Sequence, residues 1–172
     1  MIIIASYNKE NTIILSSCII TIVLLFKYIP KNKVREAHVP FLFQQTVTWF
    51  FGLLVVEKNF IKYPYRPYFK KSNKSGFSFE YFIYPALTSL FNVCYPEKRG
   101  ILFKAFYTFS YSGAVTLFEI LIEKYTDLIT YKKWSWHWSF ITMSFTYYLS
   151  RLYSRWFFKS LFNKGRPPFL NL

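Results

Sequence analysis

The sequence has little cysteine and histidine, and these shortages exclude several classes of protein. Its two cysteines, Cys18 and Cys94, cannot form a disulfide framework or a four-cysteine metal site. With only two histidines, His38 and His137, a zinc or haem centre is not expected either. We therefore expect no metal and no cofactor. Five glycines and eight prolines are too few for a collagen-like or Gly/Pro-rich disordered chain.

The common catalytic signatures are also absent. The sequence contains no HExxH, GxSxG or CxxC motif and no glycine-rich phosphate loop. We identify no catalytic residue, and the sequence favours a protein that is not an enzyme. A membrane-embedded enzyme built from Glu and Arg side chains remains an open alternative.

Apolar and basic residues are abundant instead. The chain of 172 residues is 53% apolar and 24% aromatic, and its 22 Lys and Arg against 8 Asp and Glu give a net charge of +14. A nucleic-acid-binding protein carries such bases on a soluble face, whereas a membrane protein carries them in loops beside apolar spans. The bases of this chain gather between long apolar runs, which favours the membrane protein.

Five apolar segments are long enough to approach the thickness of a bilayer as helices. They cover residues 13–29, 37–56, 77–93, 101–122 and 136–153. A helix rises about 1.5 Å per residue, and the hydrocarbon layer is about 30 Å thick. The segments lack the alternation of strands. The sequence predicts a single all-α membrane domain, residues 1–172, with about five transmembrane helices; the alternative is a soluble helical bundle with a very aromatic core.

The longest connection, residues 57–76, interleaves basic and aromatic side chains around two prolines. This composition binds single-stranded nucleic acid in some proteins and anionic lipid beside a membrane in others. We favour the lipid interpretation and expect no nucleic-acid partner. A homo-oligomer or another membrane protein is a further candidate partner.

The distribution of bases also predicts an orientation. Five spans place the two ends of the chain on opposite sides of the membrane. Slightly more Lys and Arg fall on the side of the C-terminus, so the positive-inside rule predicts a cytoplasmic C-terminus.

Four ionisable residues within or beside the spans form the first candidate site. Glu119 and Glu123 are four residues apart and share a helix face, while Glu80 and His137 begin their spans on the same side of the membrane. One interpretation is an ion or proton site in which Glu119 titrates beside His137. The other is a structural role, in which Glu119 accepts hydrogen bonds from Tyr or Ser hydroxyls of neighbouring helices.

A second candidate set lies at the opposite side of the membrane. Arg151 and Arg155 follow one stripe of the last span, and Glu36 and His38 lie at the start of the second. An Arg151–Glu36 pair would hold these spans together, and the arginines could instead bind lipid phosphate in a bidentate manner. The third interpretation is that the arginines extend to the headgroups.

Polar residues and a proline interrupt two of the spans. Gln44, Gln45 and Thr48 lie in the second span, where interhelical hydrogen bonds are their ordinary use and a solute path is the alternative. Pro85 in the third span removes a backbone donor, so we expect a kink there.

Four sequence blocks carry a family resemblance. They are REAHVPFLFQQTVTWFFGLLVVE (35–57), FEYFIYPALTSLFNVCYPE (79–97), LFEILIEKYT (117–126) and YLSRLYSRWFF (148–158). In these blocks the chain resembles an uncharacterised family of small multi-pass membrane proteins of Bacillus- and Clostridium-type spore-forming bacteria. The resemblance implies a location in the bacterial plasma membrane and transfers no activity.

Taken together, the residues predict a structural, interaction or lipid-associated membrane protein. The first alternative is a small transporter or ion-conducting protein that uses Glu80, Glu119 and His137. The second is the lipid-modifying enzyme, which would use Glu36, His38, Arg151 and Arg155 at the headgroup level.

Overall fold

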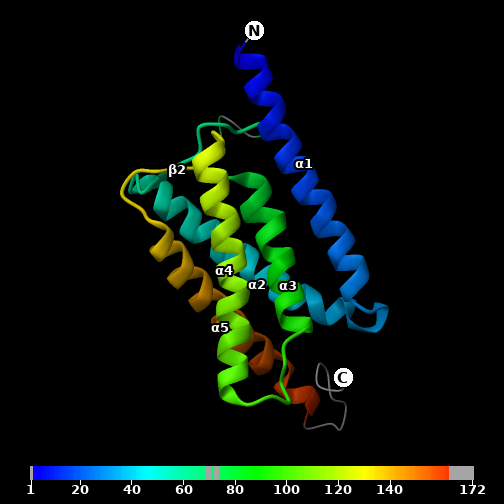
Figure 1. Ribbon diagram of the computed structural model, residues 1–172. Helices are drawn as coiled ribbons and strands as arrows, with labels where there is room; N and C mark the ends of the chain where they lie inside the picture. The colour runs from blue at the N-terminus through cyan, green and yellow to red at the C-terminus, as the bar shows by residue number, and fades with distance from the viewer. Residues whose placement is uncertain (1, 69–70, 72–73, 163–172) are drawn as a thin grey trace.

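The structure is a computed structural model that describes residues 2–68, 71 and 74–162. Its order is α1 (Ile2–Tyr28), a 3₁₀ turn η1 (Lys31–Lys33), α2 (Val34–Glu57), β1 (Ile61–Lys62), a π-helical turn η2 (Phe79–Ile83), α3 (Tyr84–Val93), α4 (Ile101–Tyr125), β2 (Thr130–Tyr131) and α5 (Trp136–Phe162). The prediction of an all-α protein is confirmed for these residues (Figure 1). Part of the connection 57–76, residues 69–70 and 72–73, lies outside the described residues.

Three helices are long and apolar enough to cross a membrane. These segments are Lys9–Tyr28, Lys31–Glu57 and Ile101–Tyr125. The predicted span 77–93 is divided between η2 and α3, and α3 itself has only 10 residues. The span 136–153 lies within α5, which has 27 residues but is less apolar than the other long helices.

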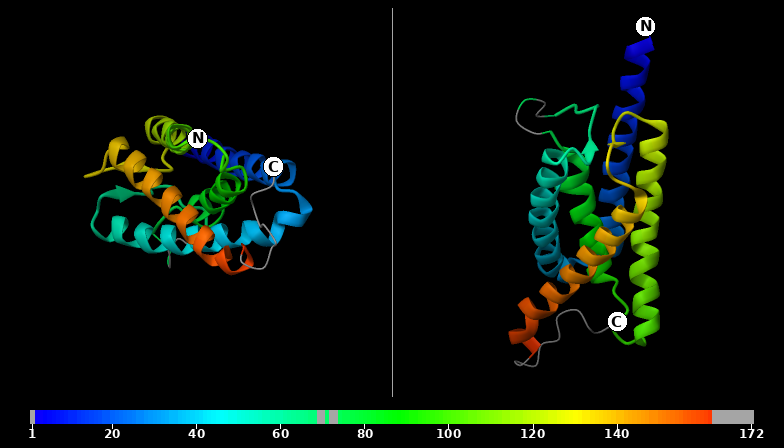
Figure 2. Two further views of the ribbon diagram at one scale, coloured as in Figure 1. Left: turned by 90° about the horizontal axis from the view of Figure 1, so that it is seen from below. Right: turned by 90° about the vertical axis from the view of Figure 1, so that its left-hand side faces the viewer.

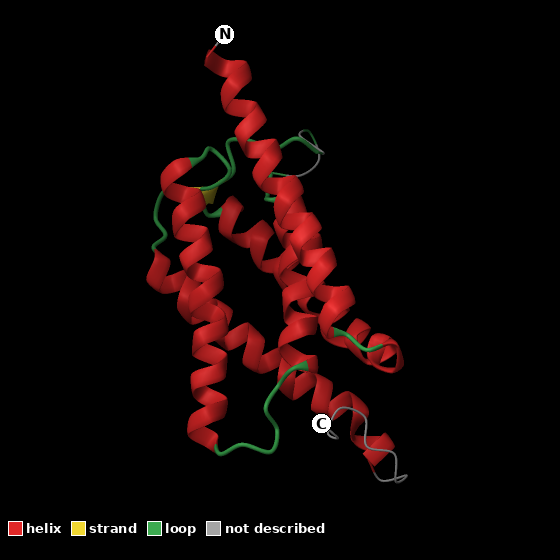
Figure 3. Ribbon diagram, turned by 45° about the vertical axis from the view of Figure 1, so that its right-hand side comes forward, coloured by secondary structure: helices red, strands yellow, loops and turns green. Residues whose placement is uncertain are grey.

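The short helix α3 lies at the centre of the bundle. It packs most extensively on α2 and also contacts α1 and α5, and the view along the bundle in Figure 2 shows it between these three helices. Eight of its ten residues are buried. The helix α1 begins at one end of the bundle, and α5 ends at the opposite end (Figure 3).

The distribution of polarity is opposite to that of a water-soluble protein. Thr88, Ser89 and Asn92 of the central helix are buried, whereas Phe26 on α1 is 85% exposed. Further large apolar side chains are exposed on all four outer helices, among them Leu15, Ile19, Ile20, Val23, Leu42, Phe50, Phe51, Leu54, Phe103, Phe106, Leu117, Ile141, Phe145, Trp156 and Phe157. An apolar surface of this extent is unfavourable in water and suits hydrocarbon.

Aromatic rings fill the space between α3, α4 and α5. Tyr147 on α5 is fully buried and contacts Phe91 with ring centroids 4.9 Å apart, and it also meets the rings of Tyr84 and Tyr111. The Tyr107 hydroxyl on α4 donates to the carbonyl of Phe91 at 3.3 Å. These tyrosines join three helices by ring packing, and the hydroxyl of Tyr107 also satisfies one backbone carbonyl.

The irregularity expected at Pro85 takes the form of the π-helical turn η2. The amide of Tyr84 donates to the carbonyl of Phe79, five residues earlier. In this register the carbonyl of Glu80 would accept from residue 85, but proline has no amide hydrogen. Side chains of α2 supply donors instead: the Gln45 amide donates to the carbonyl of Tyr81 at 3.0 Å.

Thr48 supports the same turn. Its hydroxyl lies 2.9 Å from the carbonyl oxygen of Glu80 and 2.8 Å from that of Gln44 in its own helix. Gln45 and Thr48 therefore make interhelical hydrogen bonds, which was the ordinary use predicted for them. Gln44 is fully buried, and neither atom of its amide group has a hydrogen-bond partner within the described residues.

This contrast gives a prediction for two adjacent glutamines. We expect Gln45→Leu to lower the unfolding free energy by about 1 kcal/mol, because it leaves a buried carbonyl without its donor. The matched change Gln44→Leu removes an amide that makes no bond, so stability should stay the same or rise. Thermal unfolding of both variants in the same detergent checks the difference, and an equal loss in both would contradict the assignment.

Candidate functional site

The half-buried side chain of Glu119 is held by hydroxyl groups at one end of the bundle. The Ser139 hydroxyl donates to Oε1 of Glu119 at 2.7 Å, and the Tyr131 hydroxyl makes a short hydrogen bond to the same oxygen. Ser139 in turn accepts a hydrogen bond from the indole of Trp134 at 2.8 Å. These donors come from α5 and from the connection between α4 and α5, so Glu119 fastens that connection to the bundle.

Glu80 occupies a comparable position in the turn η2. Its carboxylate has the hydroxyls of Ser75 and Tyr63 and the backbone amide of Gly76 as hydrogen-bonding neighbours. Its Oε2 atom is buried without a partner among the residues that the structure describes. The carboxylate packs closely against α2 at Gly52, where a Cβ atom would lie 2.5 Å from Oε2. A larger residue at position 52 would therefore displace the carboxylate of Glu80.

Tyr63 connects the two carboxylates. Burial raises the pKa of the Tyr63 hydroxyl well above its ordinary value, and the negative charges of Glu80 and Glu119 raise it further. Burial likewise raises the pKa of Tyr131, with the charge of Glu119 as the second cause. Both phenols therefore keep their protons at neutral pH and remain donors.

A two-stranded ladder explains how these tyrosines meet. β1 and β2 pair antiparallel, with Ile61 opposite Tyr131 and Lys62 opposite Thr130. Tyr63 is two residues beyond Ile61, and in extended chain such residues lie on the same face. The ladder thus brings Tyr63 and Tyr131 from two distant connections to one end of the bundle. Sequence reasoning missed both, because neither lies in an apolar span.

The other two residues predicted for this site have different positions. His137 is exposed and its ring stacks on Trp136 at 3.6 Å between centroids. Among the described residues the hydrogen-bond partners of Glu119 are Tyr131 and Ser139, and not His137. Glu123 is half-buried one turn beyond Glu119, and its charge is a minor cause of the raised pKa of Tyr131. The structure thus joins Glu80 and Glu119 through tyrosine rather than through histidine.

A second polar cluster lies at the opposite end, around Arg151. This side chain is 3% exposed, and its Nε donates to Oε1 of Glu97 at 2.8 Å, with a second short contact from Nη2. Its Nη1 donates to the carbonyl of Asn92 at 3.3 Å, and its guanidinium group lies 4.8 Å from the ring centroid of Tyr95. Lys104 on α4 adds an ion pair to Glu97 at 3.6 Å.

The carboxylate that binds Arg151 is thus Glu97 and not Glu36. Glu36 lies on the first turn of α2, Arg155 is exposed, and His38 is exposed with its Nδ1 2.7 Å from the carbonyl of Val34 in its own helix. The structure does not assemble these residues into one site. The signal for Glu97 was its place as the lone acid in the turn CYPEKRG, which connects α3 to α4, whereas the bases that it binds lie on α4 and α5.

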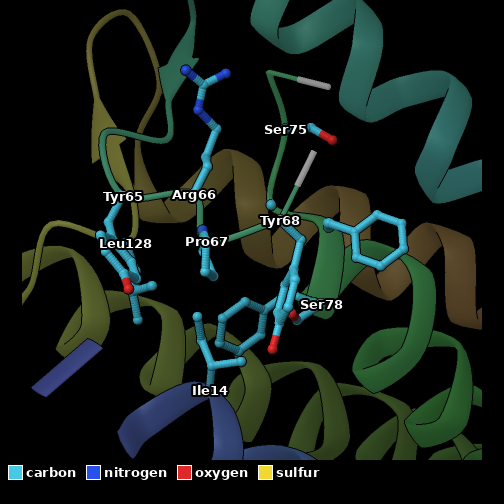
Figure 4. Close-up of a pocket in the computed structure, with 11 residues that line it drawn as sticks. Ile14, Tyr65, Arg66, Pro67, Tyr68, Ser75, Ser78 and Leu128 are labelled. Carbon is cyan, nitrogen blue, oxygen red and sulfur yellow. The ribbon is translucent and has the colours of Figure 1, made fainter. Parts of the chain in front are cut away.

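A surface pocket adjoins the first cluster. Figure 4 shows Ile14 of α1 reaching towards Pro67 and Tyr68, while the guanidinium group of Arg66 extends away from them. The lining residues are Ile14, Tyr65, Arg66, Pro67, Tyr68, Ser75, Gly76, Phe77, Ser78, Phe79 and Leu128. Ser75 and Gly76 are also hydrogen-bonding neighbours of Glu80, so this pocket adjoins the surroundings of that carboxylate. No group of three His, Cys, Asp or Glu side chains suited to a metal ion occurs in the described part of the chain.

Comparison with known proteins adds no identification. The chain matches no known protein family, no curated protein and no solved structure. The resemblance to membrane proteins of spore-forming bacteria therefore stays a prediction.

The fit of Glu80 against Gly52 can be tested with two glycines. We expect Gly52→Ala to lower the melting temperature measurably, because the new methyl group displaces the carboxylate from its hydroxyl donors. Gly113→Ala is the control, since its Cβ atom would meet only Phe140 at an ordinary 3.9 Å. Equal melting temperatures for the two variants in detergent would contradict the close packing.

The ion pair at the other end has its own test. We expect Glu97→Gln to lower the unfolding free energy by about 3 kcal/mol, because it leaves the guanidinium group of Arg151 buried without its counter-charge. The double variant Glu97→Gln with Arg151→Met should recover part of this loss. Lys104→Met, which removes only the longer ion pair, should cost about 1 kcal/mol or less. Denaturation in one detergent compares the three; no recovery in the double variant would refute the pairing.

Proposed function

We propose that this chain is an integral membrane protein of five membrane helices with a structural, interaction or lipid-associated role. The observation that carries the proposal is the reversed polarity: the outer helices expose large apolar side chains, and the central helix buries Thr, Ser and Asn. Three helices satisfy the length and composition of membrane spans. We propose the bacterial plasma membrane as the location, with the C-terminus in the cytoplasm.

The two remaining segments complete the five spans in this proposal. η2 and α3 together run from Phe79 to Val93, and the donors of α2 compensate their irregular backbone. α5 contains Arg151, whose charge is compensated by Glu97. Both features let a segment with polar groups lie in hydrocarbon, since these carbonyls and this guanidinium group are paired inside the protein.

The contacts of the buried charged residues support a role in packing. Glu119 accepts hydrogen bonds from Tyr131 and Ser139, and Arg151 is bound to Glu97 and to a backbone carbonyl. Each contact joins two different elements of the fold. We therefore propose that these residues stabilise the helix arrangement and perform no chemical step.

One observation favours the rival function, a small ion- or proton-conducting protein. Tyr63 is close enough to Glu80 and Glu119 for the charge of each to act on its hydroxyl. Two carboxylates with a phenol between them are a suitable arrangement for passing a proton. The two functions differ in what they require of Glu119, since packing needs only a hydrogen-bond acceptor.

Cell fractionation tests the location. After cell breakage we expect the full chain in the membrane pellet, and it should remain there through an alkaline carbonate wash and be released only by detergent. A chain that stays in the supernatant as a monodisperse species without detergent would overturn the proposal.

The variant Glu119→Gln separates packing from conduction. Glutamine keeps an oxygen that accepts from Tyr131 and Ser139, so we expect the fold to persist and any proton or cation flux in proteoliposomes to equal that of the wild type. Glu123→Gln serves as the control on the same helix. A flux that is present in the wild type and disappears only in Glu119→Gln would establish the rival function.

A further inference from the structure

Lys33 is a buried cation without a partner. It lies where η1 joins α2, is 8% exposed, and its Nζ atom has no hydrogen-bond partner among the described residues. Both salt bridges of the described part belong to Glu97. A buried ammonium group without an acceptor is strongly unfavourable, so an anion at this position would stabilise it.

The surroundings of Lys33 form a corner at the end of the bundle where the turn between α1 and α2 meets α3 and α5. Ala37, Val93 and Phe158 pack together there, and Ile29 lies against them. The charge of Lys33 acts on the thiol of Cys94, which is exposed at the end of α3. Protein atoms cover the ammonium group itself, and the exposed thiol of Cys94 lies within reach of its charge.

The same corner has further positive groups. Lys31 and Arg35 are exposed beside Lys33. The neighbouring acid is Glu36, on which the charge of Lys33 acts. The two form no ion pair among the described residues, and Oε2 of Glu36 is likewise buried without a hydrogen-bond partner there.

Apolar surface adjoins these cations. Ile22, Val23 and Phe26 are exposed on α1, directly before the turn, and Trp156 and Phe157 are exposed on α5. A free phosphate ion gains no stabilisation from contact with an apolar surface, whereas the acyl chains of a phospholipid pack against one.

We propose that this corner binds the phosphate group of an anionic phospholipid, with Lys33 as the central cation and Lys31 and Arg35 beside it. The proposal rests on the membrane location given above and names the lipid class and the site. It assigns the lipid to Lys33 rather than to Arg151, because Glu97 and the carbonyl of Asn92 already occupy that guanidinium group.

Lipid binding to the full chain tests the site. In native mass spectrometry from detergent, the probe is phosphatidylglycerol, with phosphatidylcholine as the uncharged comparison. We expect Lys33→Gln to weaken phosphatidylglycerol binding about tenfold, which is the effect of losing one charge-assisted hydrogen bond. Lys33→Arg should bind within about twofold of wild type. Lys98→Gln removes an exposed lysine at the same end and should also change binding less than about twofold.

Thermal unfolding gives a second measurement that a merely structural role would not produce. Without lipid, Lys33→Gln should melt at the wild-type temperature or higher, because it removes an unpaired buried charge. Phosphatidylglycerol should raise the melting temperature of the wild type and not that of Lys33→Gln. A variant that melts lower without lipid and keeps the full lipid-induced shift would overturn the proposal.

The remaining outcomes identify other ligands or none. Equal binding of the two lipids, unchanged phosphatidylglycerol binding in Lys33→Gln, or displacement of the lipid by millimolar inorganic phosphate would each refute the lipid site. If the chain resists carbonate extraction and any of these occurs, only the site is refuted. If carbonate releases the chain, the membrane location fails and the site with it.

Discussion

Hydrocarbon offers no hydrogen-bond partner, and this constraint accounts for most of the arrangement described for the bundle. The short helix α3, with eight of its ten residues buried, lies at the centre, where α2, α4 and α5 supply hydrogen-bond partners. The outer helices turn large apolar side chains outwards and keep polar residues of α4 and α5 inside the bundle. Polar side chains thus face the interior of the bundle, and apolar side chains form much of its outer surface.

The same constraint explains why the connections between helices contribute polar side chains to the ends of the bundle. Glu80 and Glu119 lie near one end, where helices alone do not supply enough donors. The ladder between β1 and β2 directs Tyr63 and Tyr131 inwards. At the other end the turn between α3 and α4 supplies Glu97 to bases on α4 and α5. Each end is therefore closed by a polar residue from a connection.

The long helices could be predicted from the sequence because each is a continuous apolar run bounded by charges. The predicted segments 13–29, 37–56, 101–122 and 136–153 each lie in a helix, apart from Ile29 directly after α1. The division of the predicted span 77–93 into the turn η2 and the helix α3 could not be predicted in detail. Pro85 showed that a donor was missing, but a π turn is stable only where a neighbouring helix supplies Gln45 and Thr48. One of the two interpretations of Glu119 predicted Tyr or Ser hydroxyls as its partners. The pairing of Glu97 with Arg151 was missed, because it depends on which helix ends meet in space.

The connectivity of the polar contacts has a consequence for biosynthesis. Gln45 and Thr48 precede the carbonyls they satisfy by fewer than forty residues (36 and 32), so the hairpin of α2 and α3 can close as soon as it leaves the ribosome. Asn92 and Glu97, by contrast, must wait more than fifty residues (58 and 54) for Ser150 and Arg151. A nascent chain that stops before α5 therefore exposes a carboxylate and an amide that quality-control proteases could recognise.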